Sequence, residues 1–329
     1  MRVLVVTNMY PSPEKPAFGT FVKEQVESLR REGADVDVFF FDGTQNKMNY
    51  VKAYFRFWAQ ISHRRYDIIH AHYVLSGMVA RAQFLLPVVL THHGLEVFTT
   101  WQRFPSRFLT PLVDRAILVS EEQKRKLKCR NVEIIPCGVD LAFFKPEPRD
   151  EARRRFNLPL DKKLVLWVGN HRRPEKRFDI VEAAVAIARE KDPAIELTLV
   201  SGLPHEVVPG YMNAGDVLLL VSDAEGSPMA IKEAMACNLP VVSVPVGDVP
   251  EVIGDTEGCY LCSQDPSDVA DKLLLALAHP GRTQGREKVR SLDEAVIARR
   301  IISLYRDVLD EKKSVSWKSL VPRRMRREL

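Results

Sequence analysis

The sequence predicts an α/β protein of two tandem domains, each built on a parallel sheet with helices on both faces. Short apolar runs alternate with amphipathic stretches along most of the chain, which is the pattern of βαβ units. The chain has 329 residues, more than the roughly 100 to 200 residues of one ordinary domain. The alternation also restarts after a charged, proline-containing stretch at 143–163. Two such domains imply a cleft between them.

The first half contains six apolar runs that we expect to be strands. A helical stretch follows the first run, with Val22, Val26 and Leu29 on one face and Gly33 at its carboxyl end. The expected strands are 2–7, 36–41, 67–72, 87–92, 116–120 and 132–136.

The second half repeats the pattern after the junction at 143–163. The expected strands are 164–169, 196–201, 216–222, 240–245 and 258–261, and the expected helices lie at about 176–190, 228–237, 266–278 and 293–310. We therefore divide the chain into an N-terminal domain at 1–150, a C-terminal domain at 151–310 and a basic tail at 311–329. Doubly wound domains bind ligands at the carboxyl ends of their strands, so the cleft is the expected site.

Composition limits the class of protein. Hydrophobic residues make up 46% and charged residues 28% of the chain, as in soluble globular proteins. No apolar run approaches the ~20 residues that span a bilayer. The five cysteines have no disulfide-framework spacing and fit a reducing compartment. These features favour a cytoplasmic protein.

The net charge of +5 is concentrated in the tail, because residues 311–329 hold seven Lys or Arg and two Glu. Two interpretations stay open for this tail: it rests on an anionic membrane, on its inner face, or it is a solvated terminus. The remaining body is near neutral, and we expect no nucleic-acid partner.

A second aromatic and basic stretch, at 49–65, has two interpretations as well. It is either an amphipathic helix packed on the sheet or a contact surface for an acceptor or a membrane. The second interpretation uses Trp58, Arg64 and Arg65.

The stretch AEGSPMAIKEAMACNLPVV, at 224–242, places two carboxylates eight residues apart in an apolar segment. We expect Ser227 to cap a helix that Pro228 opens, which puts Glu225 in the preceding loop and Glu233 inside the helix. A buried carboxylate costs several kcal/mol unless it is hydrogen-bonded, and a vicinal diol is a suitable donor. The alternative is that Glu233 and its neighbour Lys232 form a narrow solvated stripe.

This E-x7-E segment closely resembles the family 4 glycosyltransferases, which are retaining enzymes of the GT-B fold that use nucleotide-sugar donors. The resemblance spans roughly residues 1–310. It implies that Glu233 holds the ribose hydroxyls and that Glu225 contacts the donor sugar. It also implies that the donor is lined by Gly226, Ser227, Pro228, Met229 and, in the next loop, Gly247.

The stretch WVGNHRRPEKRFDIVEAA, at 167–184, resembles the loop in which the family neutralises the donor diphosphate. Lys176 matches the family lysine, but Asn170 stands at the position of the family arginine. Arg172 or Arg173 would then supply the second cation, since arginine suits bidentate contact with phosphate. The alternative is an ordinary solvated basic turn.

Two N-terminal motifs complete the resemblance. In VVLTHHGLEVF, adjacent strand residues face opposite sides, and the family pattern T-x-H-G assigns the sugar-facing position to His93 and a packing role to His92. Gly19 ends a proline-rich loop, where it either approaches a phosphate or is a simple turn glycine. His70 and His72 share one face of a strand and, with His93, suggest a zinc site as an alternative, but the acidic or cysteine ligand spacing of a catalytic zinc site is missing. We expect no metal and no cofactor.

The predicted function is metal-independent, retaining transfer of a hexose-type sugar from a UDP- or GDP-sugar to a hydroxyl of a glycan or lipid-linked acceptor. The expected catalytic residues are Lys176 for the phosphate and Glu225 and His93 for orienting the sugar. Two alternatives remain: a nucleotide-sugar epimerase of the same fold, and a non-catalytic nucleotide-sugar-binding or scaffold protein, which Asn170 favours. An NAD-dependent oxidoreductase is disfavoured because no G-x-G-x-x-G follows the first strand of either domain.

Overall fold

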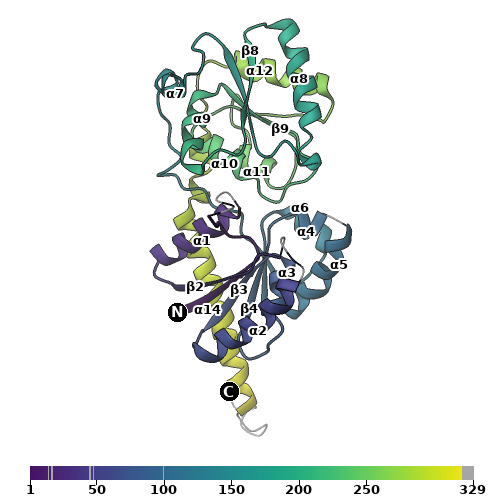
Figure 1. Ribbon diagram of the computed structural model, residues 1–329, viewed down its shortest axis with the longest axis vertical. Coiled ribbons are helices and arrows are strands. Elements are labelled where there is room, and N and C mark those ends of the chain that lie inside the picture. The colour runs from purple at the N-terminus through teal and green to yellow at the C-terminus, as the bar shows by residue number, and fades with distance from the viewer. Residues whose placement is uncertain (14, 16–17, 44–45, 47, 99, 321–329) are drawn as a thin grey trace.

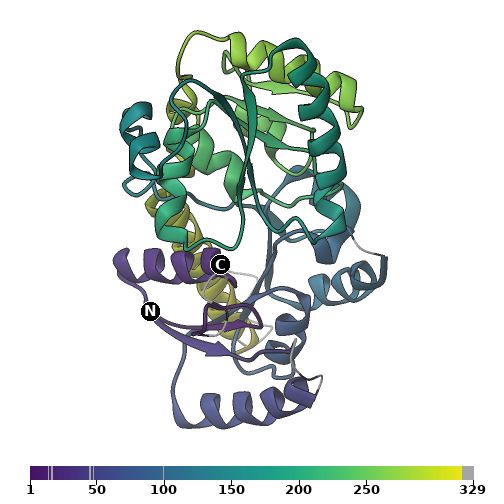
Figure 2. The same cartoon turned by 45° about the horizontal axis from the view of Figure 1, so that its top comes forward.

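The computed structural model describes residues 1–13, 15, 18–43, 46, 48–98 and 100–320. In these residues the chain forms two α/β domains that stack along the long axis of the molecule (Figure 1 and, from a second direction, Figure 2). The two-domain architecture predicted from the sequence is confirmed.

The N-terminal sheet has six parallel strands in the order β2-β1-β3-β4-β5-β6. All six predicted strands are confirmed, and their apolar sequences reflect burial on both faces, as parallel sheets require. The strands are β1 (Arg2–Thr7), β2 (Asp35–Phe40), β3 (Ile68–His72), β4 (Val88–His92), β5 (Arg115–Leu118) and β6 (Val132–Ile134).

Helices cover both faces of this sheet. On one face, buried side chains of α2 (Met48–His63), α3 (Val74–Ala80) and α5 (Thr100–Leu109) share a core with the strands. On the other face lie α1 (Thr20–Arg31) and α14 (Glu294–Leu320). The shorter elements are α4 (Leu95–Phe98), η1 (Thr110–Leu112) and α6 (Glu121–Leu127).

Helix α14 is the last part of the chain, yet it belongs to the N-terminal domain (Figure 1). Its residues Ile297, Ile301 and Tyr305 are buried in one cluster with Val26 of α1. The structure therefore differs from the division at 310, because chain order grouped this helix with the C-terminal domain. The helix also continues through residues 311–320, where a tail was expected, and residues 321–329 lie outside the described part of the chain.

The C-terminal sheet has five parallel strands in the order β11-β10-β9-β7-β8. They are β7 (Lys163–Val168), β8 (Ile195–Val200), β9 (Val217–Leu220), β10 (Val241–Ser243) and β11 (Tyr260–Leu261), at the predicted places. The helices are α7 (Arg149–Arg155), η2 (Pro174–Lys176), α8 (Phe178–Lys191), η3 (His205–Val207), α9 (Val208–Ala214), α10 (Met229–Ala236), α11 (Val249–Ile253), α12 (Pro266–Ala278), α13 (Gly285–Lys288) and η4 (Arg290–Leu292).

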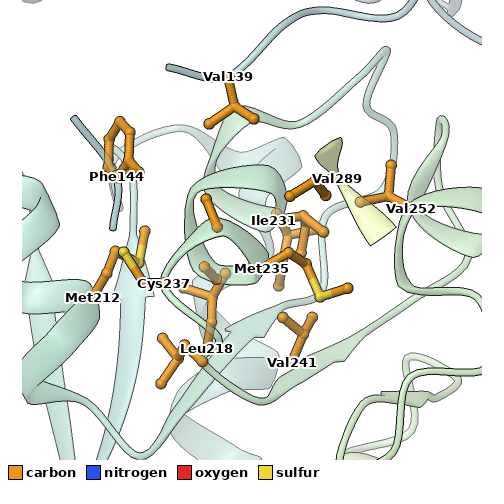
Figure 3. Close-up of a cluster of buried hydrophobic side chains, with 14 of the residues drawn as sticks. Val139, Phe144, Met212, Leu218, Ile231, Met235, Cys237, Val241, Val252 and Val289 are labelled. Atoms are coloured by element: carbon orange, nitrogen blue, oxygen red, sulfur yellow. The ribbon is translucent and has the colours of Figure 1, made fainter. Parts of the chain in front are cut away.

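Helix α10 is embedded in the core of this domain. Figure 3 shows its Ile231 and Met235 among side chains from the sheet and from neighbouring helices, including Leu218, Val241 and Val252. Every residue from Ile231 to Ala236 is buried. This packing fixes the loops at both ends of α10, and one of those loops carries Glu225.

The two domains are joined by two crossings of the chain that lie side by side. Val139, on the outward crossing, forms a parallel bridge with Asp293, on the return crossing. The Val139 amide donates to the Leu292 carbonyl at 2.9 Å, and the Glu294 amide donates to the Val139 carbonyl at 3.1 Å. The two crossings are thus bonded to each other.

Helix α7 lies inside the stretch expected to be an irregular junction, and the boundary between 150 and 151 falls within it. Its Arg153 is fully buried. The guanidinium donates to the carbonyls of residues 159, 160, 162 and 214 and to the Asp216 carboxylate at 2.5 Å. Because Asp216 also accepts the Leu164 amide at the start of β7, this arginine ties α7 to the C-terminal sheet.

We expect Arg153→Lys to lower the free energy of unfolding by about 3 kcal/mol, because an ammonium cannot reach the acceptors that the guanidinium fork satisfies and leaves Asp216 poorly paired. Urea-induced unfolding followed by circular dichroism measures this change. The matched control is Arg154→Lys at the neighbouring exposed position, which should stay within about 0.5 kcal/mol of wild type. Equal stability of the two variants would contradict the anchoring role.

Candidate active site

Three glycines bring backbone from both domains into contact. Gly94 follows β4 in the N-terminal domain, whereas Gly226 and Gly247 follow β9 and β10 in the C-terminal domain. A Cβ atom on Gly226 would lie 1.9 Å from the His93 carbonyl oxygen, and one on Gly247 would lie 2.5 Å from the Gly226 carbonyl oxygen. Only glycine fits such approaches. The loops that carry His93 and Glu225 therefore meet at the carboxyl ends of the two sheets.

A buried ion pair holds the C-terminal loops together. Lys232 is 0% exposed, and its Nζ lies 2.8 Å from Asp248 Oδ2. The Ser227 hydroxyl donates to the same oxygen at 2.6 Å, and it accepts from Lys232 and from the Cys137 amide. Ser227 is thus not the expected helix cap: Pro228 occupies that position, and no side chain caps the helix.

The solvated-stripe interpretation of Lys232 and Glu233 is wrong. Lys232 has no exposed surface and Glu233 is 6% exposed. Because the rest of α10 is surrounded by apolar side chains, Lys232 pairs with Asp248. Glu233 faces the interdomain region, where His205 lies.

Glu225 and Lys176 form an ion pair in the cleft. Lys176 Nζ lies 2.5 Å from Glu225 Oε1, and both side chains are mostly buried. Lys176 ends η2 in the loop after β7, and Glu225 lies in the loop after β9. Since β7 and β9 are neighbouring strands, the two loops meet at the point where the strand order reverses.

Of the two candidate arginines, Arg173 faces the N-terminal domain. Its guanidinium binds the Glu175 carboxylate at 2.5 Å. Burial raises the pKa of the Tyr73 phenol well above its ordinary value, and Arg173 is close enough to oppose this effect. Arg172 is exposed, and Asn170 is exposed with its side-chain oxygen accepting the Arg172 amide at 3.0 Å.

His93 lies in an aromatic column that ends at the cleft. It stacks on His72 with ring centroids 5.1 Å apart, and His72 Nδ1 and His93 Nε2 are 2.9 Å apart. Phe21 and Tyr73 flank its ring. Burial lowers the pKa of His72 to about 3 and that of His93 well below its ordinary value, so both rings are neutral. The Nδ1 atom of His93 is buried and has no hydrogen-bond partner among the described residues.

The packing role of His92 agrees with its contacts, because its Nε2 bonds to Thr110 Oγ1 at 3.0 Å inside the domain. His70 bonds to Tyr305 of α14 and to Thr91. Among the described residues, no three His, Cys, Asp or Glu side chains are arranged as ligands of a metal ion.

His205 bridges the two domains beside Glu233. Its Nδ1 lies 3.2 Å from Glu24 Oε1 of α1, and its Nε2 lies 3.7 Å from Glu233 Oε1. The Glu233 carboxylate raises the pKa of His205, and Glu24 adds to the effect against the opposing influence of burial. The rings of Phe143 and Phe144 pack against the imidazole.

Two further carboxyl groups near this bridge, Glu24 and Glu294, have raised pKa values. Burial raises the pKa of Glu24, and the charges of Glu233 and Asp140 raise it further. Burial and then Glu24 raise the pKa of Glu294 to about 7, although Arg31 at 2.8 Å opposes the shift. The interdomain region below Glu233 is therefore rich in proton-binding groups.

Three further predicted donor-binding residues are Gly19, Gly247 and Met229. Gly19 has φ 74 and precedes α1, and a Cβ there would meet the Met9 backbone at 2.6 Å, as a packed turn glycine does. The Gly247 amide, expected to face the donor, donates to Glu122 Oε2 of α6 at 3.0 Å. Met229 begins α10, as its place between the glutamates predicts.

The aromatic stretch at 49–65 is largely helix α2, whose Trp58 packs against the sheet core. Arg64 pairs with Asp37 at 3.1 Å, and Arg65 is exposed. Helix α2 begins after the carboxyl end of β2 and leads to the amino end of β3. Both arginines, at the end of this connection, therefore lie near the amino ends of the strands, away from the donor loops.

Sequence reasoning missed His205, Glu24, Tyr73 and Glu122. The sequence signal for His205 was its place in the short connection after β8, at the carboxyl end of a strand. Tyr73 directly follows β3 and has φ 68, a conformation that no local sequence signal indicates. Glu24 and Glu122 lie on helices of the N-terminal domain, and they reach the site only through contacts between the two domains.

Comparisons with known proteins match both halves of the chain to sugar-transferring enzymes. The family model described as Glycosyltransferase Family 4 matches residues 2–143, and the one described as Glycosyl transferases group 1 matches residues 202–279. A Bacillus subtilis protein named as a teichuronic acid biosynthesis glycosyltransferase, TuaC, is 27% identical over 77% of this chain and 83% of its own length. D-inositol 3-phosphate glycosyltransferase of Mycolicibacterium smegmatis is 27% identical over 63% of this chain and 59% of its own length, so the match spans less than two thirds of that relative.

Solved structures share the fold. Sucrose-phosphate synthase of Thermosynechococcus elongatus superposes with a TM-score of 0.80 at 22% identity, over 94% of this chain and 99% of that one. HepE of Anabaena, solved in complex with UDP, superposes with a TM-score of 0.69 at 16% identity, over 93% and 100%. The predicted GT-B fold is thereby confirmed, and the comparisons together support a glycosyltransferase.

We expect the part of the folding stability that Glu24, His205 and Glu294 supply to fall as the pH rises from about 6 to 8. The buried His72 and His93, whose pKa values are lowered, act in the opposite sense, so each variant is compared with the wild type at the same pH. Glu24, His205 and Glu294 all have raised pKa values in the folded chain, so the folded state binds their protons more tightly than the unfolded chain does. The contribution of His205 is complete below its ordinary pKa of 6.5 and is lost as the pH passes its higher folded value. Differential scanning calorimetry across this range measures the slope.

His205→Gln and Glu294→Gln should each flatten this dependence, whereas the exposed His63→Gln on α2 should leave it unchanged. A slope that is the same in all four proteins would show that the bridge beside Glu233 does not titrate in this window.

Proposed function

We propose that this protein is a retaining glycosyltransferase that moves a hexose-type sugar from a UDP- or GDP-sugar to a hydroxyl of a glycan or lipid-linked acceptor. One observation carries the proposal: the Lys176–Glu225 ion pair lies where loops of both domains meet, beside the glycine contact, and Glu233 on the following helix α10 faces His205. Two carboxylates and a cation on this side of the C-terminal domain suit a ligand that offers hydroxyl groups and negative charge.

The ribose of the donor would bind Glu233. This carboxylate is nearly buried, and its distance of 3.7 Å to His205 is too long for a good hydrogen bond. Its oxygens therefore have acceptor capacity left for the two protons of a vicinal diol. His205 would orient the carboxylate until the ribose arrives.

The diphosphate would bind Lys176 and Arg173. Each cation is paired with a carboxylate, Glu225 and Glu175 respectively, so the donor exchanges one anionic partner for another. Fixed cations at the leaving phosphate stabilise the charge that develops as the sugar departs. We propose that these two cations serve in place of a metal ion and that no further cofactor takes part.

The sugar and the acceptor would meet beside Glu225 and His93. Among the described residues, Nδ1 of the neutral His93 imidazole has no hydrogen-bond partner, which suits a hydrogen bond with a hydroxyl group. We assign Glu225 and His93 to positioning. Retention would follow from attack on the face that the phosphate leaves, with the phosphate oxygen taking the acceptor proton.

The proposed location is the cytoplasm, with peripheral attachment to the inner face of the membrane. All five cysteines are free thiols, as expected in a reducing compartment. No described helix is both long and apolar enough to pass through a bilayer.

A non-catalytic nucleotide-sugar-binding protein is the second candidate, and Asn170 is the observation that favours it. This residue replaces an arginine of the resembled motif and is exposed, and it accepts the amides of its neighbours Arg172 and Arg173. Such a protein would keep the donor pocket and lack turnover.

For donor binding, we expect either UDP or GDP to raise the melting temperature of the wild type, because a ligand that binds only the folded chain stabilises it. Glu233→Ala should abolish this shift. His205→Gln should retain most of it, because this change breaks the bridge and leaves the carboxylate in place. The control is Glu190→Ala at an exposed position of α8. A shift that survives in Glu233→Ala would remove the ribose assignment.

For turnover, we expect Lys176→Met to lower kcat by about 100-fold to 1,000-fold, the usual effect of removing one preorganised charge from a transition state. Release of nucleoside diphosphate from the donor that binds provides the assay, with EDTA present to test metal independence. Lys191→Met, at an exposed ion pair on α8, is the matched control. A wild type that binds the donor and never turns over would establish the binding-protein alternative.

A further inference from the structure

Large apolar side chains are exposed on one side of the N-terminal domain. Among the described residues, eleven of the seventeen exposed large hydrophobic side chains fall between Met48 and Leu112. Six of them form what we call the α5 face, with exposed fractions between 47% and 81%: Phe84, Leu85, Trp101, Phe104, Phe108 and Leu112. A soluble monomer rarely exposes so many large side chains together unless something covers them.

These side chains gather because of how α5 lies on the sheet. Trp101, Phe104 and Phe108 are three and four residues apart, so they share one side of the helix. The loop that carries Phe84 and Leu85 leads into β4, whose Val88 exchanges two hydrogen bonds with Asp114, just after η1. This loop and Leu112 of η1 therefore lie at the same end of the domain. Helix α3, which precedes the loop, packs against α5.

The exposed charges along this face are all positive. From Val74 to Val113 the charged residues are Arg81, Glu96, Arg103 and Arg107. Glu96 is buried and accepts the backbone amides of residues 93 and 94. Arg103 and Arg107 are exposed, and no carboxylate of the described chain pairs with them. Arg81 lies over the Phe84 ring at 4.5 Å.

We propose that the α5 face docks the protein on an anionic lipid bilayer. Aromatic side chains sit well at the level of the lipid headgroups, and flanking arginines bind the lipid phosphates. A second copy of the chain fits less well, because a two-fold contact through this face brings Arg103 and Arg107 toward their own copies. The proposal does not depend on the donor assignment.

Helix α14 also contacts this end of the domain. Lys312 of α14 pairs with Asp114 at 2.9 Å, and Glu311 pairs with Arg115 at 2.6 Å. The last described helix thus passes the same end of the domain as Leu112. The sequence that follows, at 321–329, holds four arginines and one glutamate. Helix α5 also begins just after the 93–98 loop, so docking through α5 keeps the cleft next to the bilayer.

Co-sedimentation of the full chain with vesicles tests the proposal. We expect binding to vesicles of phosphatidylcholine with phosphatidylglycerol, and little binding to phosphatidylcholine alone. Phe104→Ser/Phe108→Ser should weaken binding by about tenfold or more, because two exposed aromatic side chains no longer leave water. Arg103→Glu/Arg107→Glu should weaken it as well and reduce its dependence on salt. The control is Leu199→Ser/Leu275→Ser, at exposed apolar positions of the C-terminal domain.

Three outcomes would overturn the proposal. The first is a wild type that binds neither kind of vesicle. The second is aromatic-variant binding equal to wild type together with loss of binding on deletion of 321–329, which assigns the lipid contact to the tail alone. The third is a dimer in sedimentation velocity that dissociates in Phe104→Ser/Phe108→Ser, which makes the face a contact between copies. Unchanged melting temperatures would show that the variants are folded. Unchanged melting-temperature shifts on adding the nucleotide would show that the donor site is unaffected by these changes.

Discussion

The buried contact of Lys232 with Asp248 and Ser227 is the interaction on which the candidate site depends. It joins the helix α10, the loop before α10, the loop after β10 and, through the Cys137 amide, the crossing from the N-terminal domain. A buried charge without a partner costs several kcal/mol, so the three groups hold one another in a single arrangement. Glu225, Gly226 and Gly247 take their positions from loops fixed in this way.

The cationic side chains of the candidate site are paired with carboxylates of the protein itself. Lys176 is held by Glu225, Arg173 by Glu175, and His205 by carboxylates of both domains. These pairs mean that an anionic ligand competes with internal carboxylates, and part of its binding energy goes into exchanging those partners. Such exchange favours a ligand that replaces several contacts at once.

The sequence was sufficient for the strands, because continuous apolar runs between charged turns have few other interpretations. It also placed Lys176 and Glu225 in loops that follow two strands, β7 and β9, which are neighbours in the sheet. It was insufficient wherever two distant segments meet. The return of α14 to the N-terminal domain depends on tertiary packing that chain order does not reveal, and His205 acquires its partners only across the cleft. The short helix α7 was hidden because its charged residues resemble a solvated linker, although Arg153 is buried.

The paired crossings at Val139 and Asp293 have a mechanical meaning. A single connecting strand would let one domain swivel freely about the other. Two strands bonded side by side behave as a strip, which bends across its width far more easily than it twists. The bonded strip therefore restrains rotation of one domain about the other, and this restraint supports the contact between the backbones of Gly94 and Gly226.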